Sequence, residues 1–150
     1  MSTRGASLYE VISVLGIIAL IFIPVYMWYS GSYTAQELST SASSFVETVK
    51  LAQLYSQSIK NESKWGIRNN YPGDTKTYEL VSRPLAGGVV TVEKSYTFPS
   101  SVEFTGNVAI WFTEGMSTLP ETYVITLKDS RSSRMEITIY PTGVIETKRL

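Results

Sequence analysis

The chain of 150 residues contains no cysteine and no histidine. Without cysteine, no disulfide can close a loop, whichever compartment the protein occupies. Without histidine, Ser-His-Asp and Cys-His catalytic arrangements and most zinc sites are excluded. Charge of either sign is not in excess, because 13 basic residues balance 13 acidic ones. The net charge therefore requires neither a nucleic-acid partner nor an acidic substrate.

The remaining candidates for catalysis are carboxylates scattered along the sequence: Asp74, Glu93, Glu103, Glu114, Glu121 and Asp129. Nothing in the sequence brings two of them together, and solvated surface charge is the ordinary role of such residues. There is no acidic run with calcium-loop spacing and no glycine-rich phosphate loop. The sequence therefore predicts no catalytic residue, no metal site and no cofactor, and we interpret the protein as non-enzymatic.

What the chain does have is a long uncharged apolar run, Val11 to Tyr29. At about 1.5 Å per residue a helix of this length reaches about 28 Å, close to the ~30 Å hydrocarbon core of a bilayer. A secretory signal is shorter and is followed by a small-residue cleavage site, whereas this run ends in Trp28 and Tyr29. The sequence therefore predicts a retained transmembrane helix. Its N-terminus is expected inside, since Arg4 is the only charge before Glu10.

The residues before this run are Arg4-Gly5-Ala6-Ser7-Leu8-Tyr9-Glu10. A glycine after a short basic leader, with one carboxylate five residues later, resembles the class III signal of type IV pilins and pseudopilins. The resemblance implies that a prepilin peptidase cuts between Gly5 and Ala6, methylates the new N-terminus and leaves the hydrophobic helix as the stem of a filament subunit.

Glu10 matches the one intramembrane glutamate of that family. A charge at the centre of a bilayer costs about 2.5 to 3.5 kcal/mol on insertion scales but less near the edge, so energy alone does not decide between a flank charge and a carboxylate that needs a buried partner. The position of Glu10 relative to Gly5 favours the carboxylate that needs a partner. Cutting before Ala6 creates an amine four residues from Glu10, on the same face of the helix. In the family this glutamate faces the N-terminus of an adjacent subunit, so the resemblance makes Glu10 a filament-assembly residue.

We divide the sequence into a leader at 1–5, a transmembrane stem at 6–29, a candidate hinge at 30–33, an amphipathic helix at 34–67 and an antiparallel β domain at 68–150. Pro24 lacks an N–H and is expected to kink the stem. At the candidate hinge two alternatives stay open. Thr34 and Glu37 have the spacing of a capping box, which favours a helix restart, but a continuous helix fits as well.

The amphipathic helix carries an apolar stripe at spacings of three and four: Leu38, Ala42, Phe45, Val49, Ala52, Tyr55 and Ile59. We expect this stripe to pack on the protein's own sheet, and Gly66 to stop the helix. Short β-rich runs follow, at 77–82, 89–93, 96–98, 102–104, 108–112, 122–128, 134–140 and 143–148. The sequence therefore predicts an α+β fold, a long N-terminal helix packed on a C-terminal antiparallel β domain.

A long helix followed only by short strands, ending in a hairpin at 135–145, is similar to the H-type (GspH/FimT) minor pseudopilins. The chain lacks the arginines that follow the final glycine in DNA-binding relatives. Its own late basic residues, Arg131, Arg134, Lys148 and Arg149, alternate with Asp129, Glu136 and Glu146. A balanced polar face is therefore expected there, and nucleic acid is not an expected partner.

These observations predict a structural subunit of a type IV pilus-like or type II secretion pseudopilus filament. The resemblance implies the prepilin peptidase, the inner membrane and copies of itself or other pilins as partners. It places the protein in the cytoplasmic (inner) membrane as a single-pass, N-in protein that then joins an extracytoplasmic filament. Two alternatives remain, a DNA-uptake minor pilin and a membrane-anchored binding protein that does not polymerise.

Overall fold

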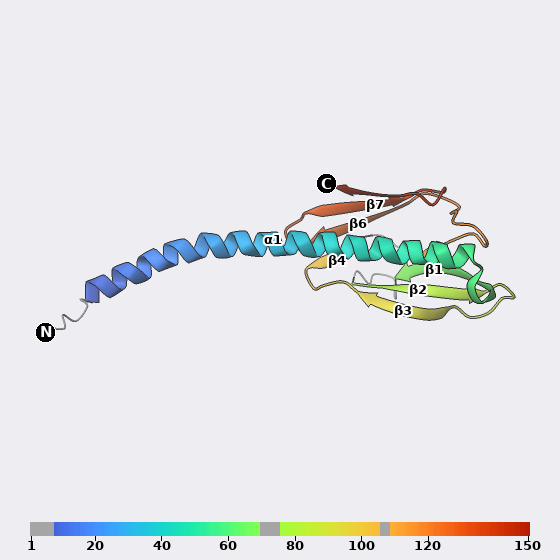
Figure 1. The fold of residues 1–150 in the computed structure, drawn as a ribbon, viewed down its shortest axis with the longest axis horizontal. Coiled ribbons are helices and arrows are strands. Elements are labelled where there is room, and N and C mark those ends of the chain that lie inside the picture. Colours follow the sequence, from blue (N-terminus) through green and yellow to red (C-terminus); the bar gives the residue numbers. More distant parts are fainter. Residues whose placement is uncertain (1–7, 70–75, 106–108) are drawn as a thin grey trace. The chain divides into compact units, whose positions relative to one another are not determined.

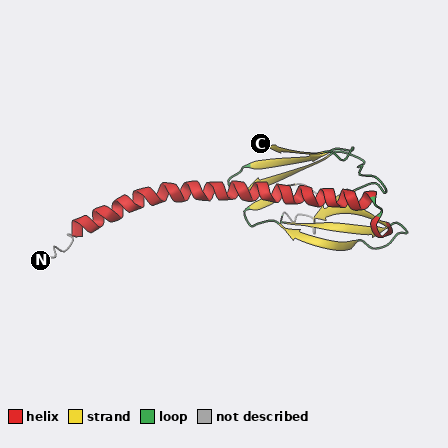
Figure 2. Ribbon diagram, in the orientation of Figure 1, coloured by secondary structure: helices red, strands yellow, loops and turns green. Residues whose placement is uncertain are grey.

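A computed structural model describes residues 8–69, 76–105 and 109–150, so the predicted turn at 71–74 lies outside the described residues. The chain divides after Thr34 into two units, and we call Ala35–Leu150 the C-terminal unit. One long helix is followed by one short helical turn and then by strands (Figure 2), so the predicted α+β fold is confirmed. The elements are α1 (Leu8–Gln57), the short 3-10 helix η1 (Lys60–Glu62), β1 (Ser63–Asn69), β2 (Thr77–Pro84), β3 (Thr91–Thr97), β4 (Val102–Thr105), β5 (Ala109–Trp111), β6 (Tyr123–Asp129), β7 (Arg134–Ile139) and β8 (Ile145–Arg149).

The described strands form two four-stranded sheets, which we call sheet A and sheet B. Sheet A has the order β3-β2-β1-β5, and sheet B has the order β4-β6-β7-β8. Every strand pair is antiparallel. In Figure 1, β1, β2 and β3 are drawn on one side of α1 and β6 and β7 on the other. Most predicted strands are present, but one strand, β3, replaces the two predicted at 89–93 and 96–98.

The part of α1 inside the C-terminal unit supplies the centre of the core. Five members of the predicted stripe are buried there: Leu38, Ala42, Phe45, Val49 and Ala52. Phe45 meets Tyr78 of sheet A edge-on, with the ring centroids 5.0 Å apart. Inward-facing residues of both sheets, among them Ile67 and Ile137, belong to the same cluster. Both sheets therefore share one core with α1, as the stripe predicted.

At the candidate hinge, α1 is helical through 30–33. The hydroxyl of Thr34 donates to the Gly31 carbonyl at 3.1 Å, a bond that threonine makes inside a helix. Thr34 therefore does not cap a new helix, and the capping-box interpretation is wrong. The continuous helix, the other alternative, is the one the structure has.

The predicted helix end near Ile67 is also wrong, because α1 ends at Gln57. The chain reverses at Ile59, which has a left-handed backbone (φ 47°), and Asn61 and Glu62 also have positive φ. Glycine usually occupies the left-handed position after a helix, so a sequence without glycine there gives no stop signal. The strand region therefore begins with β1 at Ser63 and not at residue 68.

Gly66, predicted to stop the helix, lies in the middle of β1 opposite Trp111 of β5. A Cβ at Gly66 would meet the Ile110 carbonyl and would lie 2.9 Å from the Trp111 ring. The missing side chain therefore allows β5 to pair closely with β1 while the indole lies against the Gly66 backbone.

Candidate membrane and assembly interface

The first part of α1 exposes an apolar surface that nothing in the described chain covers. We call Leu8–Tyr29 the stem. All of its large apolar residues are exposed, and even the least exposed of them, Ile18, keeps 44% of its surface accessible. Among the described residues, α1 alone is long and apolar enough to cross a membrane, judged by length and composition. A helix that is apolar all round requires an apolar environment, which a bilayer or neighbouring helices can supply.

Glu10 is the only charged residue of the stem, and it is exposed in the first turn of α1. An acidic residue in the first turn interacts favourably with the unpaired N–H groups at the helix N-terminus. No hydrogen bond or ion pair to Glu10 is formed from within the described residues, so its carboxylate is available to a partner.

Two other predicted site residues, Gly5 and Ala6, lie outside the described residues, as does the leader at 1–5. Pro24 lies inside α1, and the helix continues past it. Because proline has no N–H, the Leu20 carbonyl receives no helical hydrogen bond from residue 24. The stem is therefore one helical segment with a missing hydrogen bond near its end.

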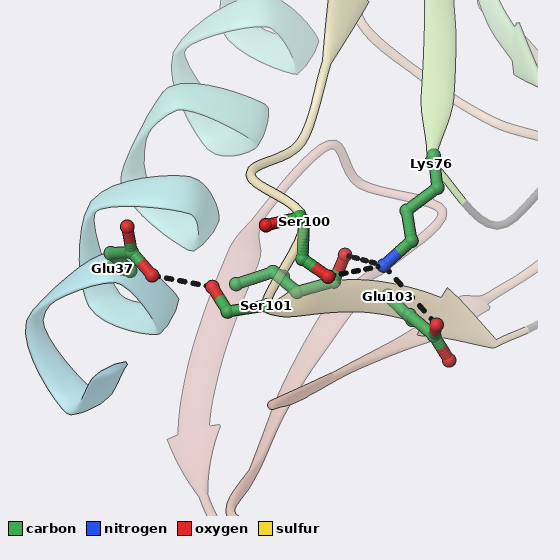
Figure 3. Close-up of polar contacts among 6 residues, drawn as sticks. Glu37, Lys76, Ser100, Ser101 and Glu103 are labelled. Carbon is green, nitrogen blue, oxygen red and sulfur yellow. Dashed lines mark hydrogen bonds and ion pairs between the residues drawn. The ribbon is translucent and has the colours of Figure 1, made fainter. Parts of the chain in front are cut away.

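Near the start of the C-terminal unit, polar contacts fasten α1 to the loop between β3 and β4 (Figure 3). The Ser101 hydroxyl donates a short hydrogen bond to the Glu37 carboxylate. The Lys76 ammonium donates to the carbonyls of Ser100 and Val102, both at 2.9 Å. It also pairs with Glu103 at 3.1 Å. These contacts pair the charge of Lys76 with that of Glu103 and hold the loop against α1 through the Ser101–Glu37 hydrogen bond.

Of the predicted carboxylate candidates that the structure describes, Glu103 and Asp129 line one pocket beside Lys128. Glu93 accepts a hydrogen bond from Ser82 at 2.6 Å, and Glu103 pairs with Lys76. The buried carboxylate of Asp129 accepts hydrogen bonds from the backbone N–H groups of Arg131 and Ser133, both at 2.8 Å, and so closes the β6–β7 turn. Asp74 lies outside the described residues. The carboxylates with contacts therefore have local structural roles.

Glu79 was not among the predicted site residues. It is buried in β2, and its carboxylate accepts a hydrogen bond from Arg68 of β1 at 3.0 Å. The two residues are cross-strand neighbours. A charged residue between Leu80 and Tyr78 alternates normally for a strand, so the sequence carried no signal that this carboxylate would be covered. Within the described residues no group of three or more His, Cys, Asp or Glu side chains could hold a metal ion.

On the outer face of sheet B, opposite charges lie directly across from each other. Lys148 of β8 is opposite Glu136 of β7, and Lys128 of β6 is opposite Glu103 of β4. Such cross-strand pairs lower the local positive potential. Residues of opposite charge therefore follow one another along the last strands and also face each other between neighbouring strands.

No family model, no curated protein and no solved structure matches this chain.

Proposed function

We propose that this protein is a structural subunit of a type IV pilus-like or type II secretion pseudopilus filament. The observation that carries the proposal is the stem, an exposed apolar helix with the single carboxylate Glu10 at its start. It is supported by Gly5 and Ala6 in the sequence before it and by the α+β unit that follows. In this proposal prepilin peptidase cuts after Gly5, and the mature chain begins with Ala6.

In this proposal the stem occupies two environments in turn. In the inner membrane, lipid covers the stem, and its N-terminus lies on the cytoplasmic side. In an extracytoplasmic filament, the stems of other subunits replace the lipid and cover the same surface. Moving Glu10 from the membrane into the filament without a partner would leave an unpaired buried charge, which is strongly unfavourable. The new amine of a neighbouring subunit supplies that partner.

Two competing functions share part of this argument. A membrane-anchored binding protein that never polymerises would need the stem but not the junction at Gly5 or the carboxylate at Glu10. A DNA-uptake minor pilin would need a surface on which positive charge dominates, whereas Lys128 and Lys148 each face a carboxylate across the sheet. The proposal therefore favours a subunit that contacts other pilins or pseudopilins.

The test is the intact mass and the N-terminal residue of protein extracted from membranes of cells with an active prepilin peptidase. The mature chain should begin at Ala6 and carry one added methyl group, and Gly5→Val should leave the full-length precursor in the membrane. Gly16→Val is the matched control, because a Cβ at Gly16 meets nothing within 4 Å and the cut is elsewhere. Recovery of wild-type protein that still begins at Met1 would overturn the proposal.

A further inference from the structure

Among the strands that the structure describes, β8 forms an open edge of sheet B. Its strand order is β4-β6-β7-β8, so β8 pairs with β7 on one side only. The Leu150 N–H donates to the Arg134 carbonyl, and the Tyr140 N–H donates to the Val144 carbonyl. Hydrogen-bonded pairs alternate along an antiparallel ladder, so the even-numbered residues of β8 bond to β7. The N–H and C=O groups of Ile145, Thr147 and Arg149 therefore point to the open edge.

The other three edges of the described sheets are less suited to accept a further strand. β4 has four residues and β5 has three. β3 is longer, but its pairing with β2 shifts register between Leu80 and Val81. Short strands and bulges are the usual means by which proteins protect a sheet edge. β8 pairs with β7 in unbroken register over its five residues.

A groove of about 450 Å³ lies between β8 and α1, within the C-terminal unit. The α1 wall includes the small residues Ser39, Ala42 and Ser43, and the sheet wall includes Thr147 and Arg149. Thr147 and Arg149 are also two of the residues whose backbone groups point to the open edge. An extended chain in the groove would therefore meet unpaired backbone groups on one side and small side chains on the other.

The groove also has a charge preference. Its charged lining residues are Glu47, Lys50 and Arg149, which sum to one positive charge. Within the part of the chain that the structure describes, neither Lys50 nor Arg149 forms an ion pair. Arginine can bind a carboxylate through two parallel hydrogen bonds, which fixes the position of the acidic residue as well as its sign.

We propose that this groove binds an extended, acidic segment of a partner polypeptide, which adds to sheet B beside β8 and presents a carboxylate to Arg149. Strand addition gives affinity through backbone hydrogen bonds and specificity through alternate side chains. The proposal goes beyond the filament function and requires neither processing nor assembly. Its outcome is therefore separate from that of the N-terminal test.

The experiment uses the full chain in detergent micelles and a panel of capped peptides of about seven residues. Each peptide alternates valine and threonine and carries one aspartate, placed at each position in turn, and a matched set carries asparagine. At least one aspartate peptide should bind with Kd below about 1 mM, and its asparagine partner should bind about tenfold more weakly. Bound peptide should slow hydrogen exchange at the amides of Ile145, Thr147 and Arg149 specifically.

Two variants change the two opposite walls of the groove. Arg149→Gln should remove the preference for aspartate over asparagine, and Ser43→Leu should fill the groove and abolish binding. Arg83→Gln is the control, because Arg83 is exposed on β2 of sheet A and does not line the groove. The proposal is overturned if no aspartate peptide binds, or if exchange at the three amides is unchanged by a bound peptide. Self-association of the chain that is lost in Ser43→Leu would assign the groove to a second copy and would also overturn it.

Discussion

The Nε2 of Gln53 donates a hydrogen bond to the Gly143 carbonyl at 2.7 Å and so joins α1 to the turn between β7 and β8. Gly143 has a left-handed backbone (φ 83°) that favours glycine. It is also crowded, because a Cβ there would lie 2.5 Å from the Ser117 carbonyl oxygen and 3.0 Å from Nε2 of Gln53. Helix, turn and the loop before β6 therefore meet at one position that has no room for a side chain.

Gly143→Ala should destabilise the protein through both strain and crowding. Gly87→Ala is the matched control, because Gly87 has nearly the same backbone (φ 86°) but nothing within 4 Å of its Cβ position. The control should lose about 1–2 kcal/mol from the left-handed backbone alone. Gly143→Ala should lose a further ~1–3 kcal/mol from overpacking. Urea denaturation of both variants checks this, and equal losses would show that the turn relaxes around the added methyl group.

Phe45→Ala should lower the free energy of unfolding of a fragment containing Ala35–Leu150 by about 3–5 kcal/mol. Phe45 is only 1% exposed and packs on Tyr78, so its removal leaves a cavity in the shared core. The fragment should be soluble, should unfold cooperatively and should be indifferent to reductant. Lys50→Ala, at an exposed position of the same helix, should change the free energy by less than about 0.5 kcal/mol. Aggregation of the fragment, or a neutral Phe45→Ala, would contradict the assigned core.

Stability should fall in alkaline solution because of Tyr78. Burial raises the pKa of its phenol above the ordinary value of 10.0, and hydrogen bonding to Ser44 opposes this only in part. The unfolded chain therefore ionises first, so the stabilisation is complete below about pH 10 and is lost as pH rises through the folded pKa. Tyr78→Phe should make the free energy of unfolding less dependent on pH above about pH 10. Denaturation curves at a series of pH values test this, and identical slopes for both proteins would exclude Tyr78 as the cause.

Glu10→Val should be inserted and processed like wild type, since an apolar side chain suits the bilayer, yet it should incorporate poorly into filaments. The measurement is the fraction of each protein that copurifies with sheared filaments. Ser13→Val is the control, because it removes a polar group one turn away, whose hydroxyl donates to the Tyr9 carbonyl. Equal incorporation of Glu10→Val and wild type would contradict the pairing role of Glu10.

Duplex DNA should not bind at micromolar protein concentration near physiological salt. Phosphate contacts gain affinity by releasing counterions, and this requires cations that are free of nearby carboxylates. Here Glu136 faces Lys148 across the sheet. Replacing Glu136 and Glu146 by lysine should create salt-sensitive binding in a mobility-shift assay, which shows that the assay can detect it. A shift by wild type that is lost when Lys148 and Arg149 become alanine would favour the DNA-uptake alternative.

The apolar periodicity of α1 was sufficient to predict the core face of the helix. Residues spaced by three and four from Leu38 to Ala52 must lie on one side of a helix, and all of them are buried. Tyr55 extends the stripe by packing against Trp65 at 4.6 Å. Ile59 does not, because it lies beyond the helix end and stays 42% exposed.

β1 was missed because its alternation is short and follows directly on the helix. Trp65 and Ile67 point into the core, and Lys64 before them and Arg68 after them are less buried, but Gly66 suggested a stop. The division of β3 into two predicted strands has a different cause. β3 is an edge strand whose residues are mostly exposed, so the polar residues Lys94 and Ser95 do not interrupt it.

Contacts between segments that are distant in the chain could not be predicted from the sequence. The Ser101–Glu37 hydrogen bond joins residues 64 positions apart, and neither residue type signals the other. The groove beside β8 depends on the strand order of sheet B, which several hairpin arrangements of the same strands would change. Gly5, Ala6 and Glu10 could be predicted as a site because they lie close together in the chain, so the signal that they resemble can be read without the fold.

The order in which the strands enter the two sheets has a mechanical consequence. β4 belongs to sheet B, although it lies between β3 and β5, which both belong to sheet A. The chain therefore crosses between sheets three times, so the segment that contains all of sheet A also contains β4 of sheet B, and the segment that contains all of sheet B also contains β5 of sheet A. Pulling on the C-terminus would have to strip β8, β7 and β6 from sheet B and would leave β4 with no neighbour. Because both sheets share one core with α1, the loss of β6 and β7 would also uncover the core face of sheet A, and we expect the rest of the C-terminal unit to give way in the same event.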